Sequence, residues 1–119
     1  MLLGRYGEAL AAEYLRKKGC RILAMNYRTR LGELDVIAAD RRYVIFAEVK
    51  LRKNAAFAEA REFVTFAKRQ KLAAAAEEWL QKNPQKLQPR FDVIEIYAPD
   101  GVDLSLIHIS EPTRRTPIS

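Results

Sequence analysis

The sequence predicts an α/β fold in one domain, with the order helix, three strands, helix, strand. Apolar residues near the N-terminus recur every three or four positions, as they do along one face of a helix. Three short runs rich in branched and aromatic residues follow, and a second helical period comes before one last run of this kind. The length of 119 residues suits a single domain and leaves no room for a second hydrophobic core.

The first part of the chain is predicted to hold one helix and two strands. The helical period covers residues 3–15, and Gly19 ends this helix in the manner of a C-terminal glycine. Residues 21–27 are predicted to form the first strand, and residues 30–32 the turn after it. The second strand is predicted over residues 33–39.

The third strand is predicted over residues 43–51, after a tight turn at residues 40–42. Most of this strand is apolar on both faces, which is typical of a central strand covered on two sides. Residues 52–64 are less periodic and predict a loop with some helical turn. The remaining elements are a helix over residues 66–82, capped by Thr65 and ended by Asn83-Pro84, and a strand over residues 90–97 between Pro89 and Pro99.

The net charge favours a polyanion as partner. The chain has 21 Lys and Arg against 15 Asp and Glu, which gives a formal net charge of +6, and the cations are spread over helices, turns and loops. A positive field of this kind attracts nucleic acid. Many small basic proteins bind no nucleic acid, so charge alone leaves that alternative open.

Cysteine and histidine are too few for a disulfide or a zinc site. Cys20 is the single cysteine and His108 the single histidine. This count excludes an intrachain disulfide and predicts a reducing, cytoplasmic compartment. Arg5, Glu8 and Glu13 interrupt the apolar residues at the N-terminus, so neither a signal peptide nor a membrane span is expected there.

The last segment, residues 104–119, resembles the translation of a transposase-type sequencing adapter. We therefore expect a single domain over residues 1–103 and expect the remainder to be a non-native or disordered tail. An ordinary flexible tail is the alternative. His108 lies in this segment and is left out of the candidate site.

Asp35, Glu48 and Lys50 are the predicted catalytic core. Glu48 and Lys50 lie two positions apart in an otherwise apolar strand, so their side chains leave the same face of it. The short hairpin places the strand of Asp35 beside this one. Burial of such groups is costly unless they pair with each other or bind an ion. A salt bridge at a strand end, without catalytic function, is the alternative.

Two carboxylates and an amine in this arrangement suit the cleavage of phosphodiesters. Carboxylate oxygens hold Mg²⁺ together with waters and a substrate phosphate. A lysine beside them can orient or deprotonate the attacking water and stabilise charge on the phosphorus oxygens. The residues therefore predict a metal-dependent nuclease site that uses Mg²⁺ or Mn²⁺.

Basic residues surround this predicted site in the sequence. Lys68 has the most support as a phosphate ligand, because it lies in the first turn of a predicted helix, whose N-terminal amides attract anions. Each of these cations is otherwise an ordinary solvated side chain. The predicted nucleic-acid-binding residues are Arg28, Arg30, Arg52, Lys53 and Lys68.

The sequence resembles the YraN-like family of small bacterial proteins related to Holliday junction resolvases. The resemblance covers residues 4–97. The motifs that carry it are Gly4-x-x-Gly7-Glu8-x-x-Ala11, Asn26-Tyr27-Arg28, Gly32-Glu33-Leu34-Asp35-Val36-Ile37-Ala38, Phe46-Ala47-Glu48-Val49-Lys50, Val64-Thr65-x-x-Lys68 and Arg90-Phe91-Asp92-Val93.

The resemblance implies a restriction-endonuclease-like αβββαβ fold, in which a central mixed sheet is flanked by helices. It implies that Asp35, Glu48 and the carbonyl of Val49 bind the metal. It also implies Lys50 as the catalytic lysine and Glu8 as an acid supplied by the first helix. The implied activity is a DNA endonuclease that acts on branched DNA as a homodimer, because symmetric cuts in a four-way junction need two active sites.

Two other functions are compatible with the same fold. A non-catalytic nucleic-acid-binding module would need the basic residues but no converging acids. An interaction protein would need neither DNA affinity nor a metal, and salt-dependent DNA binding would argue against it.

Overall fold

Helices and strands follow one another in the predicted order. The computed structural model describes residues 2–52, 66–97, 108–109 and 113–114. The elements are α1 (Leu2–Lys17), β1 (Arg21–Arg28), β2 (Glu33–Ala39), β3 (Tyr43–Arg52), α3 (Phe66–Lys82), β4 (Gln88–Tyr97), β5 (His108–Ile109) and β6 (Thr113–Arg114). Both helices and the first four strands agree with the prediction to within a few residues. The largest difference among the strands is at β4, which begins two residues before the predicted start.

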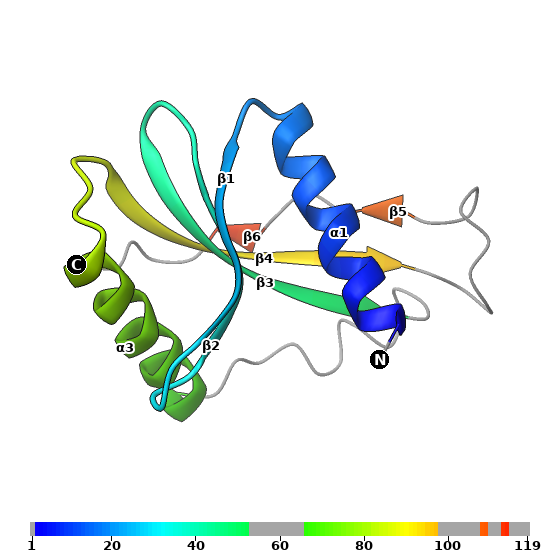
Figure 1. Cartoon of the computed structure of the whole chain (residues 1–119). Coiled ribbons are helices and arrows are strands. Elements are labelled where there is room, and N and C mark those ends of the chain that lie inside the picture. The colour runs from blue at the N-terminus through cyan, green and yellow to red at the C-terminus, as the bar shows by residue number, and fades with distance from the viewer. Residues whose placement is uncertain (1, 53–65, 98–107, 110–112, 115–119) are drawn as a thin grey trace.

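The strands form one mixed sheet with β3 at its centre (Figure 1). β1 pairs antiparallel with β2, and β2 pairs antiparallel with β3. β3 and β4 are parallel over their whole length, from Tyr43 opposite Gln88 to Arg52 opposite Tyr97. The short strands β5 and β6 both pair antiparallel with β4. The fold is therefore α/β and consistent with the restriction-endonuclease-like αβββαβ arrangement.

The two helices cover opposite faces of this sheet. On one face α3 packs against alternate residues of β3 such as Phe46, whose ring meets that of Trp79 edge to face at 5.8 Å between centroids. On the other face α1 contributes Ala11 and Leu15 to a second cluster that contains Ile45. β3 is thus covered on both sides, as its apolar sequence predicts.

A cap at the C-terminal end of α1 lets β1 begin shortly after the helix. Gly19 has a positive φ of 93°, which glycine adopts without steric cost. Its N–H donates to the carbonyl of Arg16, and the N–H of Cys20 donates to the carbonyl of Leu15, each at 3.0 Å. This is the double hydrogen bond of a Schellman cap. The predicted role of Gly19 in ending the helix is confirmed.

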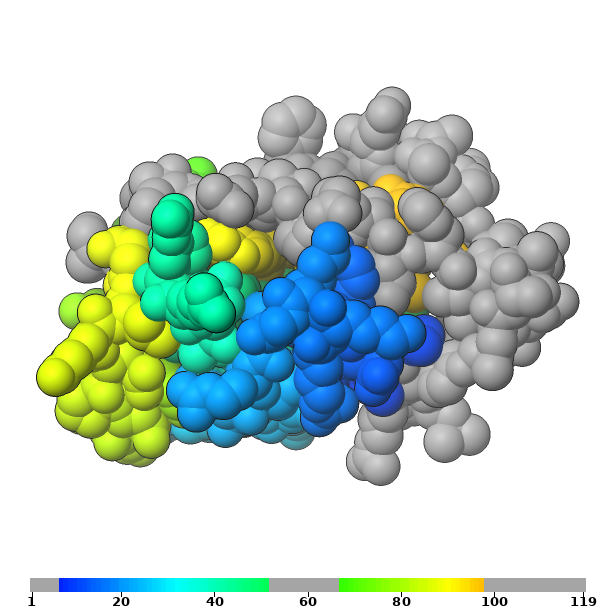
Figure 2. Space-filling model, turned by 90° about the horizontal axis from the view of Figure 1, so that it is seen from above, coloured from blue at the N-terminus to red at the C-terminus, as the bar shows by residue number. Residues whose placement is uncertain are grey.

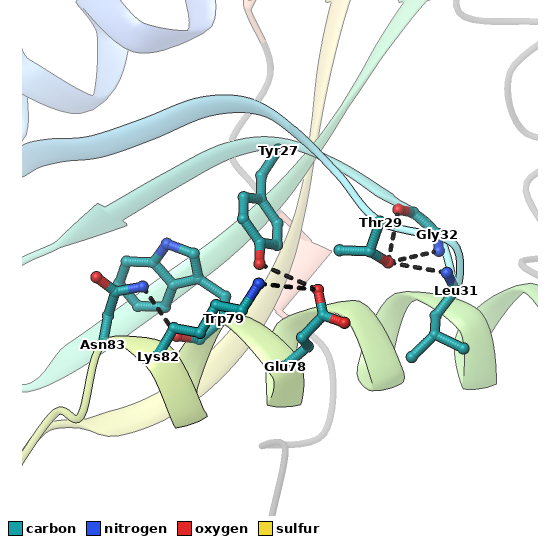
Figure 3. Close-up of polar contacts among 8 residues, drawn as sticks. All are labelled: Tyr27, Thr29, Leu31, Gly32, Glu78, Trp79, Lys82 and Asn83. Atoms are coloured by element: carbon teal, nitrogen blue, oxygen red, sulfur yellow. Dashed lines mark hydrogen bonds and ion pairs between the residues drawn. The ribbon is translucent and has the colours of Figure 1, made fainter.

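The turn between β1 and β2 lies beside α3 (Figure 3). The Thr29 hydroxyl accepts hydrogen bonds from the N–H groups of Leu31 and Gly32, at 2.9 and 3.1 Å. A Cβ at Gly32 would lie 2.9 Å from the carbonyl oxygen of Lys71, so the turn rests directly on the backbone of α3. This contact brings the start of β2 and the start of α3 to the same end of the sheet.

Some predictions fall on residues that the structure does not describe. The loop predicted over residues 52–64 and the helix cap at Thr65 lie outside the described residues, except for the end of β3. The proposed boundary at residue 103 and the non-native origin of the tail stay predictions. In the described ranges, neither helix has the length and hydropathy needed to cross a bilayer.

Candidate active site

Asp35 and Glu48 lie close together at one end of the β2–β3 ladder. The β2–β3 ladder pairs Ile37 with Phe46, and both side chains belong to the core beneath α3. Glu48 lies two residues beyond Phe46, so alternation directs it to that face, where Lys68 of α3 contacts it at 2.8 Å. Asp35 comes near Glu48 across the ladder, because its carboxylate accepts a hydrogen bond from the N–H of Val49 and the charge of Glu48 acts on it. The convergence of the two acids, which the sequence predicts, is therefore present in the structure.

Asp35 lies in a setting that disfavours its charge. Its Oδ2 accepts a hydrogen bond from the backbone N–H of Val49 at 2.8 Å. Burial raises the pKa of Asp35 from 3.8 to about 6; the Val49 hydrogen bond opposes this shift, and the nearby charges of Glu8, Glu48 and Glu33 add to it. The site therefore concentrates negative charge that a cation would relieve.

Glu48 is the most buried acid of the site, with 8% of its surface exposed. Its Oε2 lies 2.8 Å from the Nζ of Lys68 and 3.6 Å from the Nζ of Lys50. Its Oε1 is buried and has no hydrogen-bond partner among the described residues. Most buried carboxylate oxygens are hydrogen-bonded, so this atom is left for a ligand to satisfy.

Lys68 approaches the acids from the first turn of α3. Burial by itself lowers the pKa of Lys68, but the hydrogen bond and attraction of Glu48, together with Asp35, outweigh burial and raise it. The side chain is therefore a firmly protonated ammonium placed between α3 and the acid pair. The sequence predicts Lys68 as a phosphate ligand but does not indicate its direct contact with Glu48.

Glu8 comes to the site from the opposite helix. Gly7 permits this approach, because a Cβ at that position would lie 2.9 Å from Cδ2 of Leu51 on β3. Glu8 is half-buried, and its charge is the first of the three acidic neighbours that raise the pKa of Asp35. The structure thus brings together four of the predicted catalytic residues: Glu8, Asp35, Glu48 and Lys50.

The predicted DNA-binding cations have different settings. Arg28 is exposed and forms an ion pair with Glu33 at 2.9 Å. Arg30 is exposed in the turn after β1. Arg52 ends β3, but its side chain lies outside the described part of the structure, as does all of Lys53. Only Lys68 of this set contacts the acid pair in the described residues.

Two further features were not anticipated from the sequence. Asn26 has a positive φ of 54° within β1, between the Met25–Val36 and Tyr27–Leu34 pairs, so it lies opposite Asp35. Asparagine is among the few residues that tolerate this conformation, and its identity is the only signal in the sequence.

The second feature is a buried ion pair on the α1 face. Arg90 donates from Nε and Nη2 to the two oxygens of Asp92, at 3.0 and 2.8 Å. Asp92 is 1% exposed, and the guanidinium of Arg90 lies 4.6 Å from the ring centroid of Tyr43. Because alternate residues of β4 face opposite sides, this pair is separate from the acid site.

The site residues all fall within a match to a known family. Residues 7–96 match the family described as "Uncharacterised protein family UPF0102". The chain belongs to UPF0102. The resemblance to the YraN-like family is thereby confirmed, and the UPF0102 match runs from the start of the acid site in α1 to the end of β4.

Relatives named "UPF0102 protein" occur in distant bacteria. The chain is 45% identical over 95 residues to one from Syntrophotalea carbinolica, covering 79% of this chain and 77% of that protein. It is 43% identical over 110 residues to one from Geotalea daltonii, covering 92% and 87% of the two chains. A Rhodococcus opacus relative is 37% identical over 112 residues, covering 93% and 95%.

Proposed function

We propose that this UPF0102 chain is a metal-dependent endonuclease that hydrolyses phosphodiester bonds in DNA. The observation that carries the proposal is the buried Oε1 of Glu48, which has no hydrogen-bond partner within the described part of the chain and lies beside an Asp35 whose pKa is raised to about 6. A buried carboxylate oxygen without a partner, next to a second carboxylate whose charge is disfavoured, is costly in a fold unless a ligand compensates it. Such clusters are concentrated at functional sites.

The donor set fits a hard divalent cation. No group of three His, Cys, Asp or Glu side chains suited to a metal occurs in the described ranges, so a site made of protein side chains alone is not indicated there. Mg²⁺ binds through one or two carboxylates and completes its shell with water and phosphate oxygens. Asp35, Glu48 and the Val49 carbonyl would hold Mg²⁺ or Mn²⁺, which would supply positive charge beside the scissile phosphate.

The lysines supply the remaining chemistry. Lys50 lies beside Glu48 on the same strand, where its amine can orient the attacking water and donate to the phosphoryl oxygens. Lys68 is held protonated by Glu48 and reaches the site from a helix N-terminus, so it can bind the phosphate. Asp35, fixed by Val49, keeps the acid pair oriented.

The substrate and assembly follow from the charge and the family resemblance. The net charge of +6 supports a polyanionic substrate. Branched DNA, cut by a homodimer with two active sites, is the substrate that the resemblance to resolvase relatives favours. A cytoplasmic location, where DNA and Mg²⁺ are both present, accompanies this proposal.

The decisive experiment compares labelled junction, flap, single-strand and duplex DNA, each incubated with Mg²⁺, Mn²⁺ or a chelator. Asp35→Asn keeps an acceptor for Val49 and removes the charge, so it should lose cleavage and keep its fold. Asp40→Asn is the matched control, because Asp40 bonds backbone N–H groups of the β2–β3 turn, away from the site. We expect metal-dependent cleavage by wild type and Asp40→Asn alone.

The outcomes separate the alternative functions. A gel shift in wild type without cleavage in any metal would favour a non-catalytic nucleic-acid-binding module. Neither binding nor cleavage would favour an interaction protein of the same fold. Cleavage by Glu48→Gln at the wild-type rate would remove the catalytic assignment itself.

A further inference from the structure

Three turns meet at the end of the sheet that is farthest from the acid site. They join α1 to β1, β2 to β3, and α3 to β4, and they lie along the upper left of Figure 1. β3 begins here at Tyr43 and reaches the acid site at Glu48 and Lys50. At about 3.3 Å per residue, this separates the two ends by roughly 17–23 Å. We call this surface the turn end.

The turns are joined by backbone contacts, so their relative positions are fixed. Arg21, the first residue of β1, pairs with Ala39 at the end of β2. The N–H of Gln88 donates to the carbonyl of Arg42 at 3.1 Å, which ties the start of β4 to the β2–β3 turn. Figure 2 looks onto this end and shows atoms of the three turns side by side. The turn end is therefore one continuous surface.

The turn end carries a set of exposed cations. None of them forms an ion pair with a carboxylate in the described part of the chain, unlike Arg28 near the acid site. Asp40 is the acid closest in sequence to Arg41 and Arg42. Its Oδ1 accepts hydrogen bonds from the backbone N–H groups of Arg42 and Tyr43 and so stabilises the β2–β3 turn. This set comprises Lys17, Arg21, Arg41, Arg42 and Lys86. Lys18 and Lys82 are also exposed at these turns, but they contact Tyr14 and Glu78.

The spacing of these cations suits the phosphate backbone of a duplex. Arg21 belongs to β1, Arg41 and Arg42 to the β2–β3 turn, and Lys86 to the approach to β4. Three strand spacings of about 4.8 Å make a row of roughly 14 Å. The major groove of B-DNA is about 12 Å wide, so such a row can contact phosphates on both sides of it.

The same surface lacks what a membrane partner would require. The exposed large hydrophobic residues among those described are Met25 and Leu31. Met25 lies within β1, and Leu31 lies in the β1–β2 turn at the opposite end of the sheet. Peripheral membrane binding usually combines cations with inserted apolar side chains. The turn end offers only the cations.

We propose that the turn end is a second binding surface for duplex nucleic acid, which contacts phosphates without reading sequence and is separate from the acid site. The surface goes beyond the proposed nuclease activity and does not depend on it. A protein with both surfaces contacts DNA at two places, which would suit a branched substrate better than a single straight duplex.

The test measures binding of a labelled duplex by fluorescence anisotropy in chelator, across a series of salt concentrations. All proteins carry Asp35→Asn, so cleavage cannot contribute. We expect Arg41→Gln with Arg42→Gln to weaken binding about sixtyfold near 0.1 M salt, because each phosphate contact contributes about 0.9 to the slope of log K against log salt concentration, and two contacts therefore contribute about 1.8 log units between 1 M and 0.1 M salt. The slope should fall by about 1.8. Arg69→Gln with Lys71→Gln, two exposed cations on α3, is the control with an equal change in net charge.

Two further measurements keep the test decisive. If the turn variant does not fold, Lys17→Gln with Lys86→Gln removes charge from other turns. Acetylation of lysines in the full chain should show Lys17 and Lys86 protected by duplex and Lys71 still reactive. An unchanged affinity in the turn variants, equal losses in the control, or tighter binding to anionic vesicles than to duplex would each overturn the proposal. If the wild type showed no cleavage, the proposal of a second binding surface at the turn end would be unaffected.

Discussion

The Asp35 carboxylate accepts a hydrogen bond from the backbone N–H of Val49 at 2.8 Å, beyond the last recorded pair of the β2–β3 ladder. A side chain on one strand thereby contacts the backbone of the next strand between Glu48 and Lys50. This contact fixes the segment that carries both residues. This bond uses Oδ2, so in the proposed site Oδ1 would be the oxygen of Asp35 that binds the metal.

The raised pKa of Asp35 predicts how stability depends on pH. Burial, followed by neighbouring acids, raises this pKa from 3.8 to about 6, so the folded chain binds the proton more tightly than the unfolded chain does. The resulting stabilisation is present below pH 3.8 and is lost as pH rises through about 6. In chelator at about pH 8, Asp35→Asn should therefore have a higher Tm than wild type.

Thermal melts from about pH 4 to about pH 8 would measure this difference, which should shrink as pH falls through the window. Asp40→Asn removes a carboxylate from the β2–β3 turn and serves as the comparison. A Tm of Asp35→Asn at or below that of wild type at the alkaline end would contradict the assignment of an unfavourable charge to Asp35.

The contact between Lys68 and Glu48 predicts how Mg²⁺ should change the Tm of a Lys68 variant. Its ammonium lies 2.8 Å from Glu48, closer than any other cation that the structure describes, and it partly offsets the charge of the acid pair. Lys68→Ala should lower the Tm in chelator, because Lys50, at 3.6 Å, is then the one remaining cation paired with Glu48 among the described residues. Added Mg²⁺ should raise the Tm of this variant more than that of wild type. A ligand that binds only the folded state stabilises it, and in this variant the ammonium of Lys68 no longer offsets the charge of the acid pair.

Lys71→Ala, an exposed neighbour on the same helix, controls for the loss of a cation from α3. Its Tm should respond to Mg²⁺ as wild type does. Equal shifts in the three proteins would mean that Lys68 and the metal do not share the acid pair.

Local patterns predict the acid pair, but long-range packing determines what surrounds it. Strand alternation and a tight hairpin suffice to place Asp35 near Glu48, because both depend on neighbouring residues. The contact between Lys68 and Glu48 depends on how α3 lies across the sheet, which periodicity does not specify. The same reason explains the approach of Glu8, whose position follows from the packing of Gly7 against Leu51.

The ion pair of Arg90 and Asp92 illustrates the same limit. Both residues occur in a motif of the sequence, but their spacing fits an exposed strand pair as well as a buried one. Asp92 is buried because β4 lies between β3 on one side and the short strands β5 and β6 on the other. In addition, α1 covers the face of the sheet on which Asp92 lies. The burial of Asp92 therefore depends on the assembled sheet and could not be predicted from the local spacing of residues.

This buried pair predicts a large loss of stability with no direct effect on the acid site. Asp92→Asn leaves the guanidinium of Arg90 without its charged partner in a buried place, which costs about 3–5 kcal/mol. Glu33→Gln breaks the exposed pair with Arg28 and should cost less than about 1 kcal/mol. Urea denaturation of both variants measures the two losses. Similar small losses would show that the Arg90–Asp92 pair is solvated in solution.

Substitution by alanine should lower the free energy of unfolding more at Gly32 than at Gly7. A Cβ at Gly32 would lie 2.9 Å from a backbone oxygen of Lys71, which cannot move without shifting α3. A Cβ at Gly7 would meet Cδ2 of Leu51 at 2.9 Å, the far end of a flexible side chain. Gly32→Ala should therefore cost about 1–3 kcal/mol of unfolding free energy. Gly7→Ala should cost less, because Ala in a helix gains about 1 kcal/mol over Gly.

Urea denaturation gives both free energies, and cleavage assays then relate them to the site. Gly32→Ala displaces the turn from α3 and so should also move Lys68 relative to Glu48, lowering the cleavage rate of the protein that remains folded. Gly7→Ala should retain cleavage if Leu51 adjusts alone. A Gly32→Ala variant with wild-type stability would mean that the β1–β2 turn is not held against α3, and the common placement of β2 and α3 at the acid site would need another cause.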